Sequence, residues 1–131
     1  MKTTSYKPLY EIFSGTDYDI AEKIQRRRLQ MLVHSYLYYS EDMNLIDDHT
    51  FDAWGVELAK LQEQYPDIAN QVSWADAFVD WDGSTGAFLP YKDPQVVRIA
   101  NRLIGVHSER QIKIPDKPKI ITKNPARKKL F

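Results

Sequence analysis

Two segments with helical periodicity, joined by a short connection, constrain the fold of this chain more than any other feature. In the first segment, apolar residues recur at spacings of mostly three, four and one, at positions 20, 24, 29, 32, 33, 36 and 37. In the second, Phe51, Trp54, Leu58 and Leu61 keep the same period. The connection SEDMNLI has about seven residues, and such a short connection makes an antiparallel helical hairpin. The sequence therefore predicts an all-α fold.

Local signals place the ends of the two long helices. Residues 1–15 show no clear period, and a first helix is expected over about residues 17–40. Asp47 is well placed to cap a second helix that can continue to Gln64. Gly55 lies inside this helix at a cost of about 1 kcal/mol relative to Ala, which suggests a close contact with another helix.

One or two shorter helices are expected after the hairpin. Pro66 ends the second helix and can start a short one that reaches about Trp74. Residues 80–93 contain two glycines and a proline and are expected to form an ordered loop. Asp93 and Pro94 then supply a cap and a first residue for the helix PQVVRIANRLIGVH.

The charges are unevenly distributed although the formal net charge is zero. Residues 109–131 carry eight Lys or Arg and two acids, a net of +6. We expect a helical domain over residues 1–108 and a basic tail, extended and flexible unless a partner orders it, over residues 109–131. Spaced lysines on an extended chain favour salt-sensitive contact with DNA or RNA, and the candidate residues are Lys117, Lys119, Lys123, Arg127, Lys128 and Lys129. A motif for a protein partner and a merely solubilising tail stay open as alternatives.

Composition and spacing disfavour several other classes of site. The chain has no cysteine, which excludes disulfides and thiolate metal sites and suits a reducing cytoplasm. No apolar run approaches the length of a membrane span, and the N-terminus lacks a signal-peptide pattern, so a cytoplasmic protein without membrane contact is expected. His34, His49 and His107 match no metal-ligand spacing, and no metal site is assigned.

Two residue clusters are interpreted as structural. The arginine run at residues 26–28 lies mid-helix and is expected to be a solvated face, with phosphate contact as the alternative. Trp74, Phe78 and Trp81 are three to four residues apart, which is more typical of a core than of a ligand cage.

The corner of the hairpin combines aromatic rings with carboxylates. Tyr38 and Tyr39 are expected to lie near Asp48, Phe51 and Asp52, and the two acids are four residues apart, so they can share a helix face. Aromatic faces attract flat cations, and carboxylates accept hydrogen bonds from hydroxyls. This combination suits a cationic aromatic ring attached to a sugar, such as the nicotinamide riboside half of NAD. The alternative is ordinary packing at a helix end, with acids that stabilise the helix dipole.

The segment HSYLYYSEDMNLIDDHTFDAWGVELAKLQEQYPD, residues 34–67, resembles the N-terminal helical domain of bacterial NAD-dependent DNA ligases. The family pattern is close to H-x-Y-L-Y-Y/H-x-x-D-x-P-x-I-x-D-x-x-Y-D-x-L-x-x-E-L-x-x-L-E-x-x-Y/H-P. The positions that match it without a gap are His34, Tyr36, Leu37, Tyr38, Tyr39, Asp42, Ile46, Asp48, Asp52, Glu57, Leu58, Leu61, Tyr65 and Pro66.

In that family the domain caps the adenylation site and recognises the nicotinamide mononucleotide half of NAD. The resemblance implies that Tyr38 stacks on the nicotinamide ring, with Tyr39 beside it. It also implies that Asp48 and Asp52 contact the nucleotide. Phe51 stands where the family has tyrosine, so the ring is kept and the hydroxyl is lost; Tyr38 and Phe51 are expected to sandwich or edge the ring. NAD or nicotinamide mononucleotide is the expected, weakly bound ligand.

The chain lacks the chemistry of a ligase. That chemistry needs a lysine nucleophile in Lys-x-Asp-Gly, and this chain has DWDG, with Asp80 at the lysine position. An aspartate cannot form the lysyl phosphoramidate, and 131 residues leave no room for the adenylation fold. We therefore expect a noncatalytic nicotinamide-nucleotide binding module and assign no catalytic residue. A free-standing copy of such a domain suggests a mobile-element or bacteriophage protein.

Two other functions stay open. The chain can be an interaction protein that uses the hairpin as a scaffold and docks on DNA or on a replication or ligation protein through its basic tail. Cleavage of NAD at the nicotinamide bond, with Asp48 or Asp52 near the ribose, lacks a second catalytic group.

Overall fold

The computed structural model describes residues 7–83 and 86–113, and every regular element within them is helical. In chain order the elements are α1 (Leu9–Ile12), α2 (Gly15–Ser40), α3 (Asp48–Gln64), α4 (Pro66–Ala69), one turn of 3₁₀ helix (Asp76–Phe78) and α5 (Pro94–Lys113). The predicted all-α fold is confirmed.

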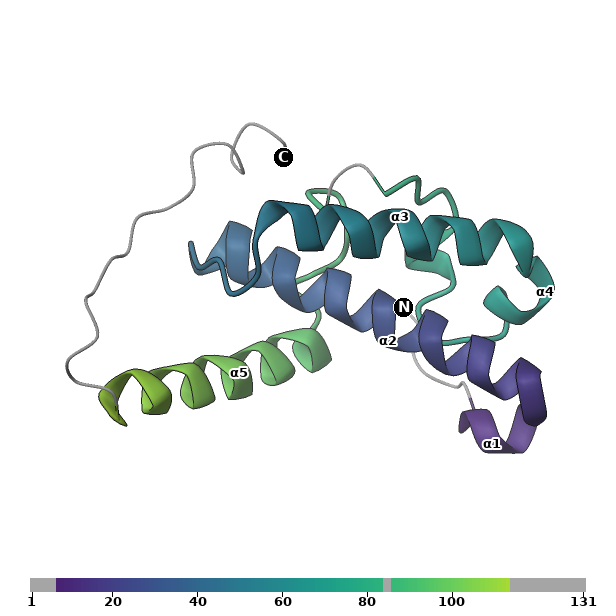
Figure 1. Ribbon diagram of the computed structural model, residues 1–131, viewed down its shortest axis with the longest axis horizontal. Helices are drawn as coiled ribbons and strands as arrows, with labels where there is room; N and C mark the ends of the chain where they lie inside the picture. The colour runs from purple at the N-terminus through teal and green to yellow at the C-terminus, as the bar shows by residue number, and fades with distance from the viewer. Residues whose placement is uncertain (1–6, 84–85, 114–131) are drawn as a thin grey trace.

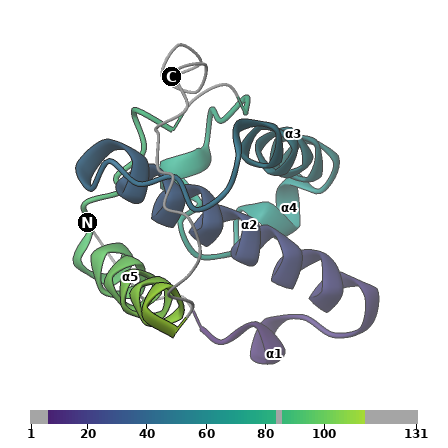
Figure 2. The same ribbon diagram turned by 60° about the vertical axis from the view of Figure 1, so that its left-hand side comes forward.

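Helix α2 is the centre of the arrangement. It contacts α1, α3, α4 and α5. Helix α3 runs back alongside α2, as the short connection predicted, and α5 lies on the other side of α2 (Figures 1 and 2). A single long helix therefore carries most of the packing surface, and the hairpin corner lies at its C-terminal end.

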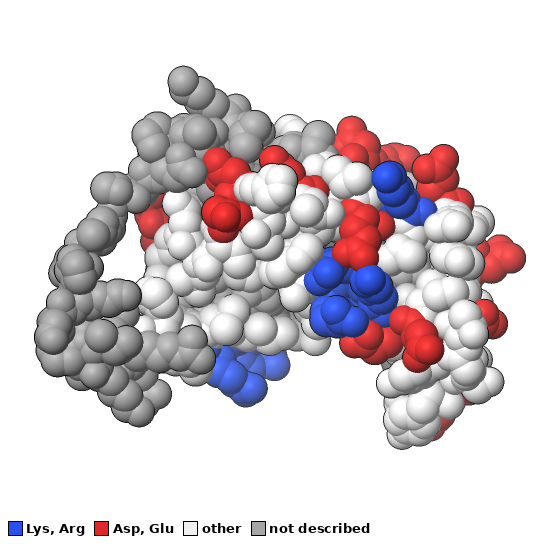
Figure 3. Space-filling view, viewed as in Figure 1, with Lys and Arg blue, Asp and Glu red and all other residues white. Residues whose placement is uncertain are grey.

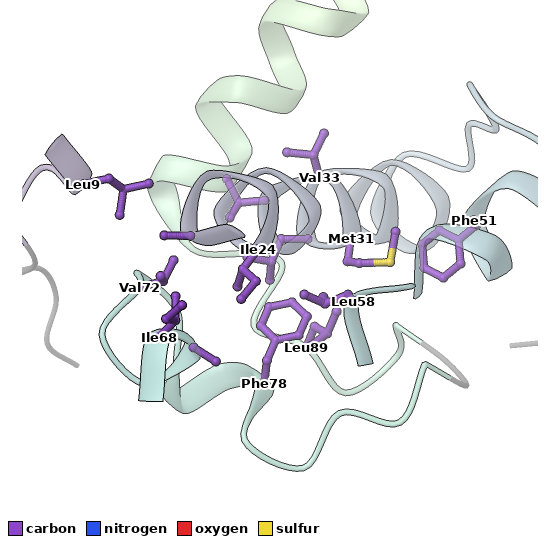
Figure 4. Close-up of a cluster of buried hydrophobic side chains, with 14 of the residues drawn as sticks. Leu9, Ile24, Met31, Val33, Phe51, Leu58, Ile68, Val72, Phe78 and Leu89 are labelled. Atoms are coloured by element: carbon purple, nitrogen blue, oxygen red, sulfur yellow. The ribbon is translucent and has the colours of Figure 1, made fainter. Parts of the chain in front are cut away.

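The core collects apolar side chains from α2, α3, α5 and the segment between α4 and α5 (Figure 4). Its most deeply buried members include Ile24, Met31, Leu32, Leu37, Phe51, Leu58, Val72, Phe78, Val96 and Ala100. Phe78 is buried, and Trp74 and Trp81 pack against the same cluster, so the interpretation of these aromatic residues as core is confirmed.

The capping signals are confirmed at both predicted positions. The carboxylate of Asp47 accepts a hydrogen bond from the backbone N–H of Thr50 at 2.8 Å, and α3 ends at Gln64 as expected. The carboxylate of Asp93 accepts one from the backbone N–H of Gln95 at 2.9 Å, just before the first turn of α5. Both caps depend on neighbouring residues alone, which is why the sequence reveals them.

Three boundaries differ from the predictions. The single turn of α1 lies in residues 1–15, where no period was apparent. The short helix after Pro66 ends at Ala69 and does not reach Trp74. Helix α5 continues to Lys113, so residues 109–113, predicted as the start of an extended tail, are helical. The six candidate tail residues between Lys117 and Lys129 lie outside the described residues.

The prediction of a solvated face for the arginine run was wrong for Arg28. Arg26 is exposed and Arg27 is half-buried, but Arg28 is only 2% exposed. Its guanidinium donates to the carbonyl oxygens of Val72 and Ser73 at 3.0 Å, to that of Ala69 at 3.1 Å and to the side-chain oxygen of Gln62 at 2.8 Å. Arg28 therefore holds the chain where α4 ends, because it satisfies carbonyls that a continued helix would have paired.

Gly55 was predicted to allow a close contact with another helix, and this prediction was wrong. Its close contact is with a loop. A Cβ atom at Gly55 would come within 3.1 Å of the Gly83 carbonyl oxygen and 3.3 Å of the Trp81 ring. The Trp81 indole N–H donates to the Gly55 carbonyl oxygen at 3.1 Å. Gly83 itself has φ +87°, a conformation that glycine adopts without strain. The two glycines thus allow the start of the loop, at Trp81 and Gly83, to pack directly against α3.

Candidate functional site

The two adjacent tyrosines of the corner lie in the last turn of α2. Tyr38 is 9% exposed, and Tyr39 is half-buried. Their rings meet edge to face, with centroids 4.9 Å apart and planes at 85°. The structure therefore brings together the two rings that the sequence singled out, with Tyr39 the more accessible of the pair.

The two candidate carboxylates lie in the first turns of α3. Asp48 and Asp52 are both half-buried, and one carboxylate oxygen of Asp48 has almost no contact with solvent. Asp52 lines a shallow depression on the outer side of α3, together with His49 and Val56. Asp52 therefore borders solvent in this depression, whereas the buried oxygen of Asp48 does not.

Phe51 is buried beneath the loop that precedes α5. Its side chain is 1% exposed and belongs to the core (Figure 4). Gly86 covers it: a Cβ atom at Gly86 would come within 3.3 Å of the tip of the Phe51 ring and 3.0 Å of the Ser35 Cβ. The Phe51 ring has no face open to solvent. The expected sandwich of a ligand ring between Tyr38 and Phe51 therefore has no exposed Phe51 surface to use.

A further aromatic residue, Tyr91, joins the corner from the same loop. Its ring stacks on that of Tyr39, with centroids 5.6 Å apart and planes at 16°. Sequence reasoning missed this contact because no spacing rule links position 91 to position 39. The pairing depends on the path of the loop between Gly83 and α5.

Charged residues of α2 and α3 pair with one another across the hairpin. Glu57 contacts Lys23 at 2.6 Å and Arg27 at 2.8 Å, and these contacts, Lys23 first, hold the pKa of Glu57 below its ordinary value. The guanidinium of Arg27 also lies over the Trp54 ring, 4.9 Å from its centroid. Trp54 therefore contributes to the contact between the two helices.

The exposed arginine of the run is paired as well. Arg26 contacts Glu22 at 2.8 Å, and this hydrogen-bonded pair lowers the pKa of Glu22 and raises that of Arg26. Figure 3 shows positive side chains lying next to negative ones on the face viewed. Arg26 and Arg27 thus pair with acids of the protein itself, and Arg28 is buried, which argues against the phosphate-contact alternative.

Two other kinds of site have no support in the described part of the chain. Among its side chains, no three of His, Asp or Glu lie close enough together to hold a metal ion. None of its helices combines the length and apolarity needed to cross a bilayer.

Comparison with known families gives a match. Residues 17–74 match the family model of the N-terminal NAD+-binding domain of DNA ligase-like proteins. No curated protein and no solved structure matched the chain. The matched segment extends on both sides of residues 34–67, where the resemblance was first apparent, and it includes all five candidate residues of the corner. Gly86 and Tyr91 lie beyond it.

Proposed function

We propose that the hairpin corner binds the nicotinamide nucleotide half of NAD, or nicotinamide mononucleotide alone, without catalysing a reaction. The observation that carries this proposal is the match of residues 17–74 to an NAD+-binding domain, because the matched segment includes the tyrosine pair and both carboxylates. The fold that presents these residues is the helical hairpin of α2 and α3.

The chemistry of the corner suits this ligand. The nicotinamide ring of NAD is flat and positively charged, and the half-buried Tyr39 supplies a ring on which such a cation can stack. Asp52 faces solvent at the start of α3, where its carboxylate can offset the ring charge and accept hydrogen bonds from the ribose hydroxyls. We assign Asp48 to the same role and Tyr38 to the support of Tyr39.

The proposal is restricted to binding because the nucleophile of ligase chemistry is replaced. Asp80, in the DWDG sequence, is exposed and has no amine that could accept an adenylyl group. A site formed by one corner also leaves much of the ligand in solvent. Because affinity depends on the ligand surface that is buried, we expect a Kd in the range of about micromolar to millimolar.

Calorimetric titration with nicotinamide mononucleotide and with NAD tests the proposal. Asp52→Asn removes the charge of the accessible carboxylate at constant size and should weaken binding at least about tenfold, since hydrogen bonds to charged groups contribute about 1.5–3 kcal/mol. The matched control is Asp67→Asn, which removes an exposed carboxylate in the first turn of α4, at the other end of α3. The proposal fails if the wild-type protein gives no heat up to millimolar ligand, or if the two variants bind alike.

A second candidate function is docking through the basic segment. Residues 109–131 carry eight Lys or Arg against two acids, whereas the arginine run of α2 is engaged in contacts within the domain. This candidate predicts salt-sensitive binding of DNA, or capture of a replication or ligation protein, that is lost when residues 109–131 are deleted and is unaffected by Asp52→Asn.

A further inference from the structure

The segment from Gly86 to Tyr91 covers the corner that we propose as the nucleotide site. Its first residue lies directly on Ser35 and Phe51, so closely that even a methyl group at position 86 would collide with the Ser35 side chain. Its last residue stacks on Tyr39. The chain itself therefore covers both the buried and the half-exposed rings of the site.

The stacked pair of tyrosines leaves no space for a third ring. Their centroids are 5.6 Å apart, and their planes differ by 16°. A ring inserted between two others needs two stacking gaps of about 3.5 Å each. A nicotinamide ring can thus stack on this face of Tyr39 only if Tyr91 leaves it.

The covering segment is only partly buried. Leu89 is its one buried large side chain, at 8% exposure, whereas Phe88 is 90% exposed. Within the segment, the backbone N–H of Leu89 donates to the Gly86 carbonyl at 3.2 Å, and that of Tyr91 donates to the Leu89 carbonyl at 2.8 Å. Because these hydrogen bonds are internal to the segment, they can persist when Tyr91 moves off Tyr39.

We propose that Tyr91 is an internal competitor for the aromatic ligand, so that the nucleotide binds by displacing Tyr91 from Tyr39. This inference rests on the proposed function of the corner. It adds that Tyr91 regulates ligand binding there. The apparent affinity of such a site is the intrinsic affinity reduced by the fraction of molecules in which Tyr91 has left. Weakening the Tyr39–Tyr91 contact therefore strengthens ligand binding, which is the opposite of what removing a ligand-contacting residue does.

Titration of the full chain with nicotinamide mononucleotide tests this inference through the sign of the effect. Stacking between aromatic side chains typically contributes a factor of about two to ten in an equilibrium constant. Tyr91→Ala should therefore lower the Kd roughly two- to tenfold, whereas Tyr91→Phe, which keeps the ring, should leave it unchanged. Tyr10→Ala, which removes an exposed tyrosine from α1, is the matched control and should also have no effect.

A second variant opens the corner at the other end of the segment. Gly86→Ala pushes the segment off Ser35 without altering either tyrosine, and it should also lower the Kd. Thermal unfolding of each variant checks that the helical domain is still folded at the titration temperature.

The possible outcomes separate this inference from the function on which it rests. If the wild-type protein binds and Tyr91→Ala binds with equal or lower affinity, Tyr91 does not compete with the ligand and the inference is overturned, while the proposed function stands. If the wild-type protein and every variant give no heat, the proposed function fails and the inference fails with it.

Discussion

Replacing Arg28 tests whether a buried guanidinium holds α4 and the chain that follows it against α2. Arg28→Met keeps the apolar length of the side chain and removes every donor. Four acceptors then lose a donor: the carbonyl oxygens of Ala69, Val72 and Ser73 and the side-chain oxygen of Gln62. The Ala69 carbonyl keeps a second donor, the backbone N–H of Val72 at 3.3 Å. The substitution leaves the residues of the proposed site untouched.

The expected loss of stability follows from these contacts. A buried acceptor deprived of its donor costs about 1–3 kcal/mol, and water can reach the half-buried Ser73 more easily than it can reach Ala69 or Val72. We therefore expect Arg28→Met to lower the free energy of unfolding by about 3–5 kcal/mol, which is a large fraction of the roughly 5–15 kcal/mol typical of a domain. The stability of Arg28→Lys should lie between those of the wild type and Arg28→Met, because one ammonium cannot reach all four oxygens.

Urea unfolding followed by far-ultraviolet circular dichroism measures this loss. The control is Arg26→Met, which removes a neighbouring arginine whose pair with Glu22 is exposed, and it should cost less than about 1 kcal/mol. A loss below about 1 kcal/mol for Arg28→Met would refute the argument, since it would mean that the four oxygens find other donors at no cost.

Two further predictions concern the loop and the ion pairs. Gly83→Ala should destabilise the protein by about 1–3 kcal/mol in urea unfolding, because φ is +87° and a Cβ atom would come within 3.0 Å of the α3 backbone. Gly105→Ala, in the open part of α5, should be neutral or stabilising by up to about 1 kcal/mol, and equal effects at the two positions would contradict the argument. Glu57→Gln should destabilise by less than about 1 kcal/mol at neutral pH, because the carboxylate that contacts Lys23 and Arg27 is partly exposed. Since these contacts lower the folded-state pKa, the difference between wild type and variant should vanish as the pH falls from the ordinary value of 4.5 through the lowered one, and a difference that persists in acid would contradict this cause.

The features that could be predicted from the sequence depend on residues close together in the chain. The period of apolar residues identified α2 and α3, and the acid at Asp47 identified the start of α3. The corner residues Tyr38, Tyr39, Asp48 and Asp52 could be proposed from the sequence because one short segment carries them all, and this segment lies within the family match at residues 17–74.

The features that could not be predicted depend on contacts between distant residues. Arg28 looked like part of a charged helix face, and only the return of the chain at Val72 shows that its guanidinium is buried. The short helix was predicted to be longer for the same reason, since local propensity does not show which distant side chain will take its carbonyls. The stacking of Tyr91 on Tyr39 joins a loop residue to a residue of α2, and no local sequence pattern predicts it.

The central claim is that the α2–α3 corner binds a nicotinamide nucleotide, and amide chemical-shift mapping during titration with nicotinamide mononucleotide tests it most directly. The account predicts saturable shifts confined to the corner, from about Tyr38 to Asp52, and to the covering segment from Gly86 to Tyr91. The amides of α4, at the other end of α3, should not move (Figure 1). An absence of shifts at millimolar ligand, or shifts centred away from the corner, would contradict the claim.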